Sequence, residues 1–202
     1  VIGGTVGALA GYFGGWLDSI LMRITDALLA LPIMPILIIM AALDFGKLPL
    51  IGPMFVGQDL SILKMVIIFV VFSWMIQARL VRGAVLSARE QEYVLAAKTL
   101  GMHHFQVIAQ EILPNVIAPV IVSVTLNVGQ TILFEAVLSF LGLGIQPPTP
   151  SWGNMMSNAL EAMYYAPSLI IIPGLLILMV VVSFNFLGDG LQDALDPKAI
   201  RR

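Results

Sequence analysis

Long apolar runs separated by short polar segments dominate the chain. About 20 consecutive apolar residues are enough for a helix to cross a hydrocarbon core of roughly 30 Å. We therefore expect an all-α, polytopic bundle of transmembrane helices with about five spans, forming a single membrane domain over residues 1–202. The expected spans cover residues 1–15, 27–43, 62–80, 116–143 and 169–187.

Small and helix-breaking residues mark the first two runs. Residues 1–15 look like the end of a span whose beginning is missing. Gly7 and Gly11 form a small-x-x-x-small pattern that lets helices approach closely, and we expect it to pack within the bundle. Pro32 and Pro35 are tolerable inside the second span, because neighbouring helices can satisfy the freed backbone groups.

Five polar connections separate or follow the spans, the longest of which is residues 81–114. Residues 16–26 are too polar for hydrocarbon and predict an interfacial turn, and residues 44–59 predict a short loop. Residues 155–165 space their apolar positions as a helix does, which predicts a short amphipathic helix with a buried apolar side. The tail from residue 188 predicts a brief helix that Pro197 ends.

Composition agrees with a membrane protein and narrows the chemistry. The chain is 59% hydrophobic and 11% charged with a mean hydropathy of +0.98, whereas soluble domains are roughly a quarter charged. It has no cysteine, no G-x-x-x-x-G-K-[ST] phosphate loop and no H-E-x-x-H metal motif. His103 and His104 are adjacent, so on a helix they would diverge by about 100° and make a poor metal site. We expect no enzyme activity, metal or cofactor on this chain.

Basic residues are distributed unevenly between the two sides of the membrane. If successive spans alternate in direction, eight basic residues share one side and two, Lys47 and Lys64, lie on the other. The positive-inside rule then places segment 81–114 and the C-terminus in the cytoplasm and the Pro-rich segment 144–167 outside. The eight are Arg23, Arg79, Arg82, Arg89, Lys98, Lys198, Arg201 and Arg202.

Residues 81–114 form the one long polar insert. Four apolar positions in it recur at i, i+3, i+4 and i+7, which predicts a helix with one apolar face. They are Tyr93, Ala96, Ala97 and Leu100. Gly101 should end this helix, and a second helix is expected over 103–113, separated from the next span by Pro114. Pattern alone leaves two interpretations at even weight: a hairpin resting on lipid headgroups, or an element that docks a soluble motor subunit.

A polar stripe runs along the predicted fourth span. Its residues recur every four positions, with one more near the same arc. They are Ser123, Asn127, Thr131, Glu135 and Ser139, with Gln130 beside them. The stripe either lines a translocation path or bonds helices together, and the pattern leaves both open. An unpaired charge facing lipid at mid-membrane would cost about 2.5–3.5 kcal/mol, so we expect Glu135 to face protein or water.

The run Leu95-Ala96-Ala97-Lys98-Thr99-Leu100-Gly101, followed by Leu113-Pro114, resembles the EAA loop of binding-protein-dependent ABC importer permeases. Other runs resemble the C-type permease subunit of the dipeptide and oligopeptide branch, to which nickel importers also belong. They are residues 11–16, 139–144, 146–154, 187–191 and 195–197. The resemblance covers essentially the whole chain. In two departures, Leu95 stands where the family has its glutamate, and Glu111 stands where it has isoleucine.

The resemblance implies a type I ABC importer permease in a bacterial or archaeal plasma (inner) membrane, with the family's first span missing here. It implies that segment 81–114 docks into a groove of an ATP-binding subunit. The docking residues are then expected to be Arg89, Glu92, Leu95, Ala96, Ala97, Lys98, Leu100 and Gly101. Implied partners are a second permease, two ATP-binding subunits that carry ATP and Mg, and an external substrate-binding protein, with no nucleic acid.

Selectivity in this family is largely set by the binding protein, so the resemblance favours a structural or gating contact near the external end for Glu135. It leaves the substrate open among dipeptides, oligopeptides and nickel. Two functions from other classes remain. An ion-coupled secondary carrier or channel would carry several intramembrane ionisable groups or inverted repeats, whereas this chain shows one such group and no evident repeat. A membrane scaffold that only anchors a soluble complex would not depend on the polar stripe.

Overall fold

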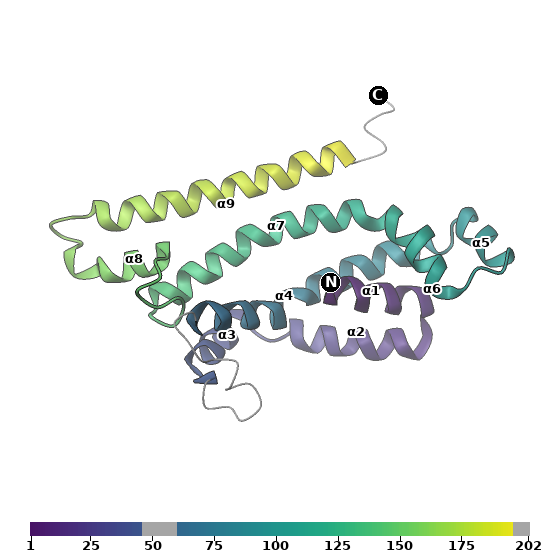
Figure 1. The fold of residues 1–202 in the computed structure, drawn as a ribbon, viewed down its shortest axis with the longest axis horizontal. Helices are drawn as coiled ribbons and strands as arrows, with labels where there is room; N and C mark the ends of the chain where they lie inside the picture. The colour runs from purple at the N-terminus through teal and green to yellow at the C-terminus, as the bar shows by residue number, and fades with distance from the viewer. Residues whose placement is uncertain (46–59, 196–202) are drawn as a thin grey trace. The chain divides into compact units, whose positions relative to one another are not determined.

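The computed structural model describes residues 1–45 and 60–195, and these ranges contain helices and connections but no strand (Figure 1). A π-helical segment, Val107–Ile112, lies between α6 and α7, and a 3-10 helix, Leu160–Ala162, follows α8. The predicted all-α class is confirmed. The α-helices are α1 (Ile2–Phe13), α2 (Gly15–Leu29), α3 (Ile33–Ala42), α4 (Leu60–Ala88), α5 (Glu92–Thr99), α6 (His104–Gln106), α7 (Leu113–Phe140), α8 (Trp152–Asn158) and α9 (Ser168–Leu195).

Three of the described helices are long and apolar enough to cross a membrane: α4, the continuous run His104–Phe140, and α9. The pair α2 and α3 would make a fourth span if counted together, although the two are bent by 80° at their junction. Helix α1 is apolar but has only 12 residues. The chain is therefore a multi-pass membrane protein. Each of the five predicted apolar segments lies mainly in helices, although the second is interrupted at residues 30–32.

The first polar connection is shorter than the sequence predicts. Gly14 and Gly15 have φ of 66° and 59°, in the left-handed region that glycine adopts without strain, and they turn the chain directly from α1 into α2. The predicted interfacial turn over residues 16–26 is therefore wrong, because this segment is helical. Pro32 is the N-cap of α3, so the predicted span over 27–43 is broken at the proline rather than continuous.

The sequence predicts that Pro114 separates the helix over residues 103–113 from the next span, and the structure does not show this separation. Pro114 lies in the first turn of α7, directly after the π-helical segment. Proline lacks the N–H that an α-helix needs at this point. The helical run nevertheless continues through the proline, and the side-chain amide of Asn115 donates to the carbonyl oxygen of Glu111 at 2.6 Å.

The predicted helix in the tail is not a separate element. Residues from Gly188 to Leu195 continue α9, whose interior also accommodates Pro173. The predicted loop over residues 44–59 and the stop at Pro197 fall mostly or wholly outside the described ranges.

One compact unit contains residues 1–31, 73–125 and 188–195 of the described chain. Within it α1 lies against α4 through three glycines spaced four residues apart. A Cβ atom added to Gly3, Gly7 or Gly11 would lie 2.3, 2.4 or 2.9 Å from a backbone oxygen of α4. Only glycine permits so close an approach, and the expected packing of Gly7 and Gly11 within the bundle is confirmed.

Helix α2 joins the same unit through charged side chains. Asp18 and Arg82 of α4 form a two-pronged pair, with Arg82 Nε 2.5 Å from Oδ1 and Nη2 2.6 Å from Oδ2 of the carboxylate. A second pair, Asp26 with Arg79, is looser at 3.7 Å and mostly exposed. These partners explain why the polar residues of α2 can be helical beside an apolar bundle.

The second unit contains residues 32–45, 60–72 and 126–187 of the described chain. Its core is apolar and includes Leu37, Met65, Ile68 and Leu138, all at most 3% exposed. Gly153 in α8 contacts α7 directly, because a Cβ atom there would lie 2.3 Å from the carbonyl oxygen of Ala136. Helix α8 is thus fixed to the end of α7.

The predicted amphipathic helix over 155–165 is two short pieces, α8 and the 3-10 helix. Its expected apolar side is not buried within the chain, since Leu160 and Met163 are 45% and 42% exposed. Asn154 instead organises this region. Its amide donates to the carbonyl oxygens of Thr149 and Ile145, and its Oδ1 accepts from the backbone of Ser151.

Candidate coupling site

The predicted docking helix exists as α5 and ends where the sequence predicts. Gly101 follows it with φ of +83°, a conformation that favours glycine. The N–H of Met102 donates to the carbonyl oxygen of Ala97 at 3.2 Å, and that of Gly101 donates to Lys98 at 3.0 Å. This pair of bonds is the Schellman arrangement that closes a helix with glycine. Lys98 in the last turn and Glu92 in the first both complement the helix dipole.

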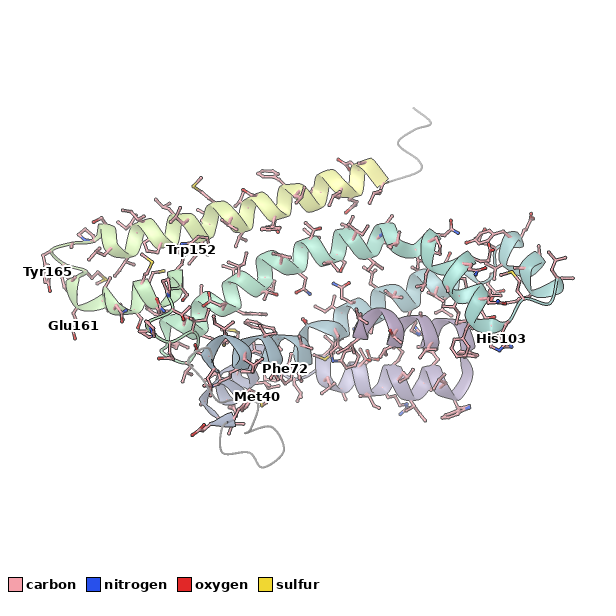
Figure 2. All side chains as sticks on the ribbon, in the orientation of Figure 1. Met40, Phe72, His103, Trp152, Glu161 and Tyr165 are labelled. Carbon is pink, nitrogen blue, oxygen red and sulfur yellow. The ribbon has the colours of Figure 1, made fainter. Side chains whose placement is uncertain are left out.

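The next helix begins with a reciprocal cap. The ring Nδ1 of His103 accepts from the backbone N–H of Phe105 at 3.4 Å, and Gln106 Oε1 accepts from the backbone N–H of His103 at 3.2 Å. Figure 2 shows His103 at this start of α6, beside α5. His103 therefore has a structural role as a cap. The described residues hold no group of three or more potential metal-ligating side chains.

The apolar face of α5 differs from the predicted one. Val94 and Ala97 are 0% and 6% exposed and pack on a core formed by α1, α4, the π-helical segment and α7. Leu95 and Leu100, in contrast, are 48% and 85% exposed. Leu100 follows the last residue of α5, so a face extrapolated at helical spacing does not reach it. Val94 and Ala97 therefore hold α5 on the core, while the larger side chains of Leu95 and Leu100 are exposed.

Three of the eight predicted docking residues contact the chain itself. Arg89 donates to the carbonyl oxygen of Gly11 at 3.0 Å and forms an ion pair with Glu90 at 2.9 Å. Ala97 lies in the core, and the Lys98 ammonium lies 5.1 Å from the ring centroid of Tyr12. The remaining five are exposed; they are Glu92, Leu95, Ala96, Leu100 and Gly101. Docking stays a prediction for all eight residues.

Sequence reasoning missed Tyr12 and His104 as members of this site. Tyr12 is 7% exposed, and its hydroxyl shares a hydrogen bond of 2.9 Å with His104 Nδ1. The two residues are 92 positions apart, so no local periodicity connects them. The only sequence signal was that Tyr12 lies in one of the family-like runs.

The predicted polar stripe on α7 is largely bonded within the chain. Thr131 Oγ1 donates to the backbone oxygen of Asn127 at 2.9 Å. Ser139 is 1% exposed; its hydroxyl donates to Glu135 Oε1 at 2.6 Å and accepts from the backbone N–H of Ile145 at 3.0 Å. Glu135 is thus tied to the connection that follows α7.

The other two predicted stripe residues are not bonded to this set. Ser123 is half-buried and Gln130 is exposed. Whether the stripe lines a path or joins helices stays a prediction.

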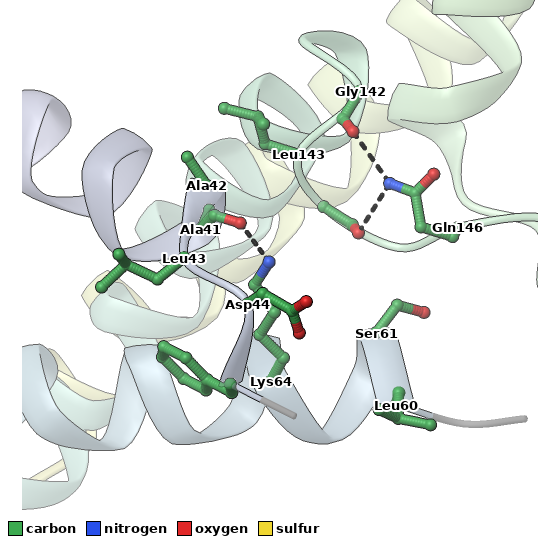
Figure 3. A pocket seen from close by; sticks show the side chains of 12 residues that line it. Ala41, Ala42, Leu43, Asp44, Leu60, Ser61, Lys64, Gly142, Leu143 and Gln146 are labelled. Carbon is green, nitrogen blue, oxygen red and sulfur yellow. Dashed lines mark hydrogen bonds between the residues drawn. The ribbon is translucent and has the colours of Figure 1, made fainter. Parts of the chain in front are cut away.

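A pocket in the second unit lies between the end of α3, the start of α4 and the connection after α7 (Figure 3). The Lys64 ammonium donates to the carbonyl oxygen of Ala41 and lies 6.0 Å from the centroid of the Phe45 ring. Gln146 Nε2 donates to the carbonyl oxygens of Gly142 and Gly144, at 2.9 and 3.2 Å. Lys64 and Gln146 thus donate hydrogen bonds to backbone carbonyl oxygens of the residues that line the pocket.

Comparison with known proteins shows which family the chain belongs to. The family model described as "Binding-protein-dependent transport system inner membrane component" matches residues 3–201. The chain belongs to this family. This confirms the resemblance that the EAA-like run and the other motifs indicated.

Similar proteins include three permeases of peptide or glutathione transport systems. A dipeptide transport system permease protein of Alkalihalophilus pseudofirmus is 42% identical over 98% of this chain and 60% of its own length. A glutathione transport system permease protein of Pectobacterium atrosepticum is 39% identical over 98% of this chain and 61% of its length. An oligopeptide transport system permease protein of Mycobacterium tuberculosis is 37% identical over the whole chain and 66% of its length. The chain thus spans about three fifths of the relatives it matches.

Proposed function

We propose that this chain forms the greater part of a permease subunit of an ATP-driven importer that moves peptides or similar small solutes inward. Family membership supports this assignment, and the names of the similar proteins favour a peptide over nickel. The observation that carries the mechanism is α5, a helix held on a core by Val94 and Ala97, with Leu95 exposed on it and Leu100 exposed directly after its end.

The proposed assembly pairs this subunit with a second permease, two ATP-binding subunits that supply ATP and Mg, and an external binding protein. Segment 81–114 and the C-terminus face the cytoplasm in this proposal, as the distribution of basic residues favours. Segment 144–167 then faces the binding protein's side. Closure of the ATP-binding subunits would displace α5 and rock the spans between inward-open and outward-open states.

The contact with the ATP-binding subunit is proposed to be mainly apolar. Leu95 occupies the position of the family's glutamate, and Leu100 is 85% exposed. Burying an exposed leucine side chain contributes about 1.5–3 kcal/mol. An exposed ion pair contributes about 0–1 kcal/mol, so the apolar pair outweighs a salt bridge through Glu92 or Lys98.

Replacement of Leu100 by glutamine tests this contact. We expect membrane insertion to persist, while recovery of the ATP-binding subunit with the purified permease and ATP-driven uptake both fall. Leu160→Gln is the matched control, because Leu160 is also exposed but lies in the predicted external segment. Normal recruitment by the Leu100 variant would contradict an apolar contact at this residue. Uptake that persists after deletion of the ATP-binding subunits would contradict the proposed function itself.

Replacement of Gly101 by valine tests the role of the turn. A β-branched residue is strained at φ of +83°, so α5 should lose its fixed C-terminal end. We expect uptake and recruitment to fall together. Gly83→Val provides the control, because Gly83 is exposed and helical in α4, and a Cβ atom there meets nothing within 4 Å in the described chain. Coupled transport at the control level in the Gly101 variant would contradict the proposed role of the turn.

A further inference from the structure

The C-terminal end of α1 contacts side chains from the residue after α4, from α5 and from α6. Arg89, one residue after the end of α4, donates to the carbonyl oxygens of Gly11 and Tyr12 at 3.0 and 3.5 Å. The last carbonyls of a helix have no partner within it, so a donor arriving from elsewhere fixes that end in place. The end of α1 is therefore tied to the end of α4.

Tyr12 connects this same point to the coupling site. Its ring lies under the Lys98 ammonium of α5, with 5.1 Å between the nitrogen and the ring centroid. Its hydroxyl is hydrogen-bonded to Nδ1 of His104, the first residue of α6, at 2.9 Å. Lys98 and His104 lie on either side of the Gly101 turn. One buried tyrosine thus contacts both helices that the turn joins.

Helix α1 is also in close contact with α4. Helix α1 meets α4 through Gly3, Gly7 and Gly11, where backbone contacts backbone with no layer of flexible side chains between them. Close-packed contacts of this kind transmit a displacement rather than absorbing it. A movement of α5 that reaches Tyr12 would be passed to α1 and from α1 to the second half of α4.

We infer that Tyr12 is a positioning residue for transport, which ties the coupling helix α5 to α1 so that α5, α1 and residues 73–88 of α4 move as one body. This inference rests on the proposed function. It assigns to α1 a part in transmission that neither the EAA-like motif nor the exposed surface of α5 indicates.

Replacement of Tyr12 by phenylalanine tests the hydroxyl alone, because the ring under Lys98 is kept. The complete transporter is reconstituted in vesicles with its ATP-binding subunits, second permease and binding protein. We expect normal assembly but fewer solutes imported per ATP hydrolysed, by about two- to tenfold if one hydrogen bond's worth of coupling is lost. Tyr164→Phe is the matched control, because Tyr164 is 90% exposed in the predicted external segment.

Three outcomes of this experiment are distinguishable. An unchanged ratio of solute to ATP in the Tyr12 variant overturns the inference while the proposed function stands. Loss of assembly also overturns it, because Tyr12 would then maintain the docking surface rather than transmit movement. Absence of ATP-driven uptake in the unmodified transporter overturns the proposed function itself.

Spin labels provide a readout that a merely structural role would not move. The chain has no native cysteine, so pairs of introduced cysteines can be labelled uniquely when the partner subunits are also cysteine-free. Thr5 in α1 and Thr99 in α5 are both exposed. We expect the distance between labels on them to be the same without nucleotide and with ATP bound, and to differ between these states once Tyr12 is replaced by leucine.

A second label pair, Thr5 with Ser87 in α4, is the control for this measurement. It spans the glycine contacts, which the Tyr12 substitution leaves intact, so its distance should be constant in both proteins. A distance between Thr5 and Thr99 that changes with nucleotide in the unmodified transporter would overturn the inference. The inference is also overturned if the distance between Thr5 and Thr99 stays fixed in the Tyr12→Leu variant.

Discussion

Replacement of Gly7 by alanine should separate α1 from α4. A Cβ atom at this position would lie 2.4 Å from the carbonyl oxygen of Ala78 and 2.8 Å from Cβ of Val81, whereas ordinary contact begins at 3.4 Å. Both obstacles are close to the backbone of α4 and cannot rotate away. Helix α1 must therefore withdraw by about 1 Å, and gaps of this size forfeit a quarter to a half of each dispersion contact along the seam.

Two opposing terms set the size of the effect. Overpacking in a well-packed interior costs about 1–3 kcal/mol. Alanine in place of glycine within a helix returns about 1 kcal/mol of intrinsic helix propensity. The net change for Gly7→Ala is therefore expected to lie between no loss and a loss of about 2 kcal/mol in the free energy of unfolding.

Gly4→Ala isolates the steric term. Gly4 belongs to the same helix, but a Cβ atom there meets nothing within 4 Å in the part of the chain that the structure describes. It should show only the gain in propensity, so that the two variants differ by about 1–3 kcal/mol. Unfolding of the purified subunit in detergent, followed by tryptophan fluorescence, measures this difference, since Trp74 contributes one of the oxygens that contact α1. Equal stability of the two variants would refute the close contact between α1 and α4 at Gly7.

Two further predictions concern polar contacts. Asp18→Asn should lower the free energy of unfolding by about 1–3 kcal/mol, because Arg82 then loses the carboxylate it grips with two nitrogens, whereas Asp26→Asn, at a looser and exposed pair, should cost less than about 1 kcal/mol. Equal thermal shifts would contradict this ranking. Ser139→Ala should cost about 1–3 kcal/mol because two hydrogen-bond partners are left unmatched. Ser183→Ala, which loses only a bond to its own helix, should change stability by less than about 0.5 kcal/mol, and a similar loss in both would argue against a special role for Ser139.

Features that depend on local chemistry could be predicted from the sequence. Apolar runs of sufficient length predict spans because lipid leaves backbone groups no other partner than their own helix. Gly101 was predictable as a helix stop because the left-handed conformation there favours glycine. The close approach of helices at Gly7 and Gly11 follows from residue size alone.

Features that depend on distant partners could not be predicted. Pro114 should end a helix by its own chemistry, but it lies in the first turn of α7, directly after a π-helical segment, and the run continues. The polar start of α2 looked unfit for a helix because its partners lie about 60 residues further along the chain. Likewise, the helical spacing of Tyr93 to Leu100 gave no indication that Val94 would be the buried residue of α5.

The burial of Val94 and Ala97 has a consequence for how a complex assembles. A partner that meets Leu95 and Leu100 meets a helix whose backbone is already ordered, closed by its glycine and seated on its own core. The loss of conformational freedom occurs when the subunit folds, and little of it is left to oppose association. If α5 docks a soluble subunit as proposed, that association can therefore be specific and still reversible.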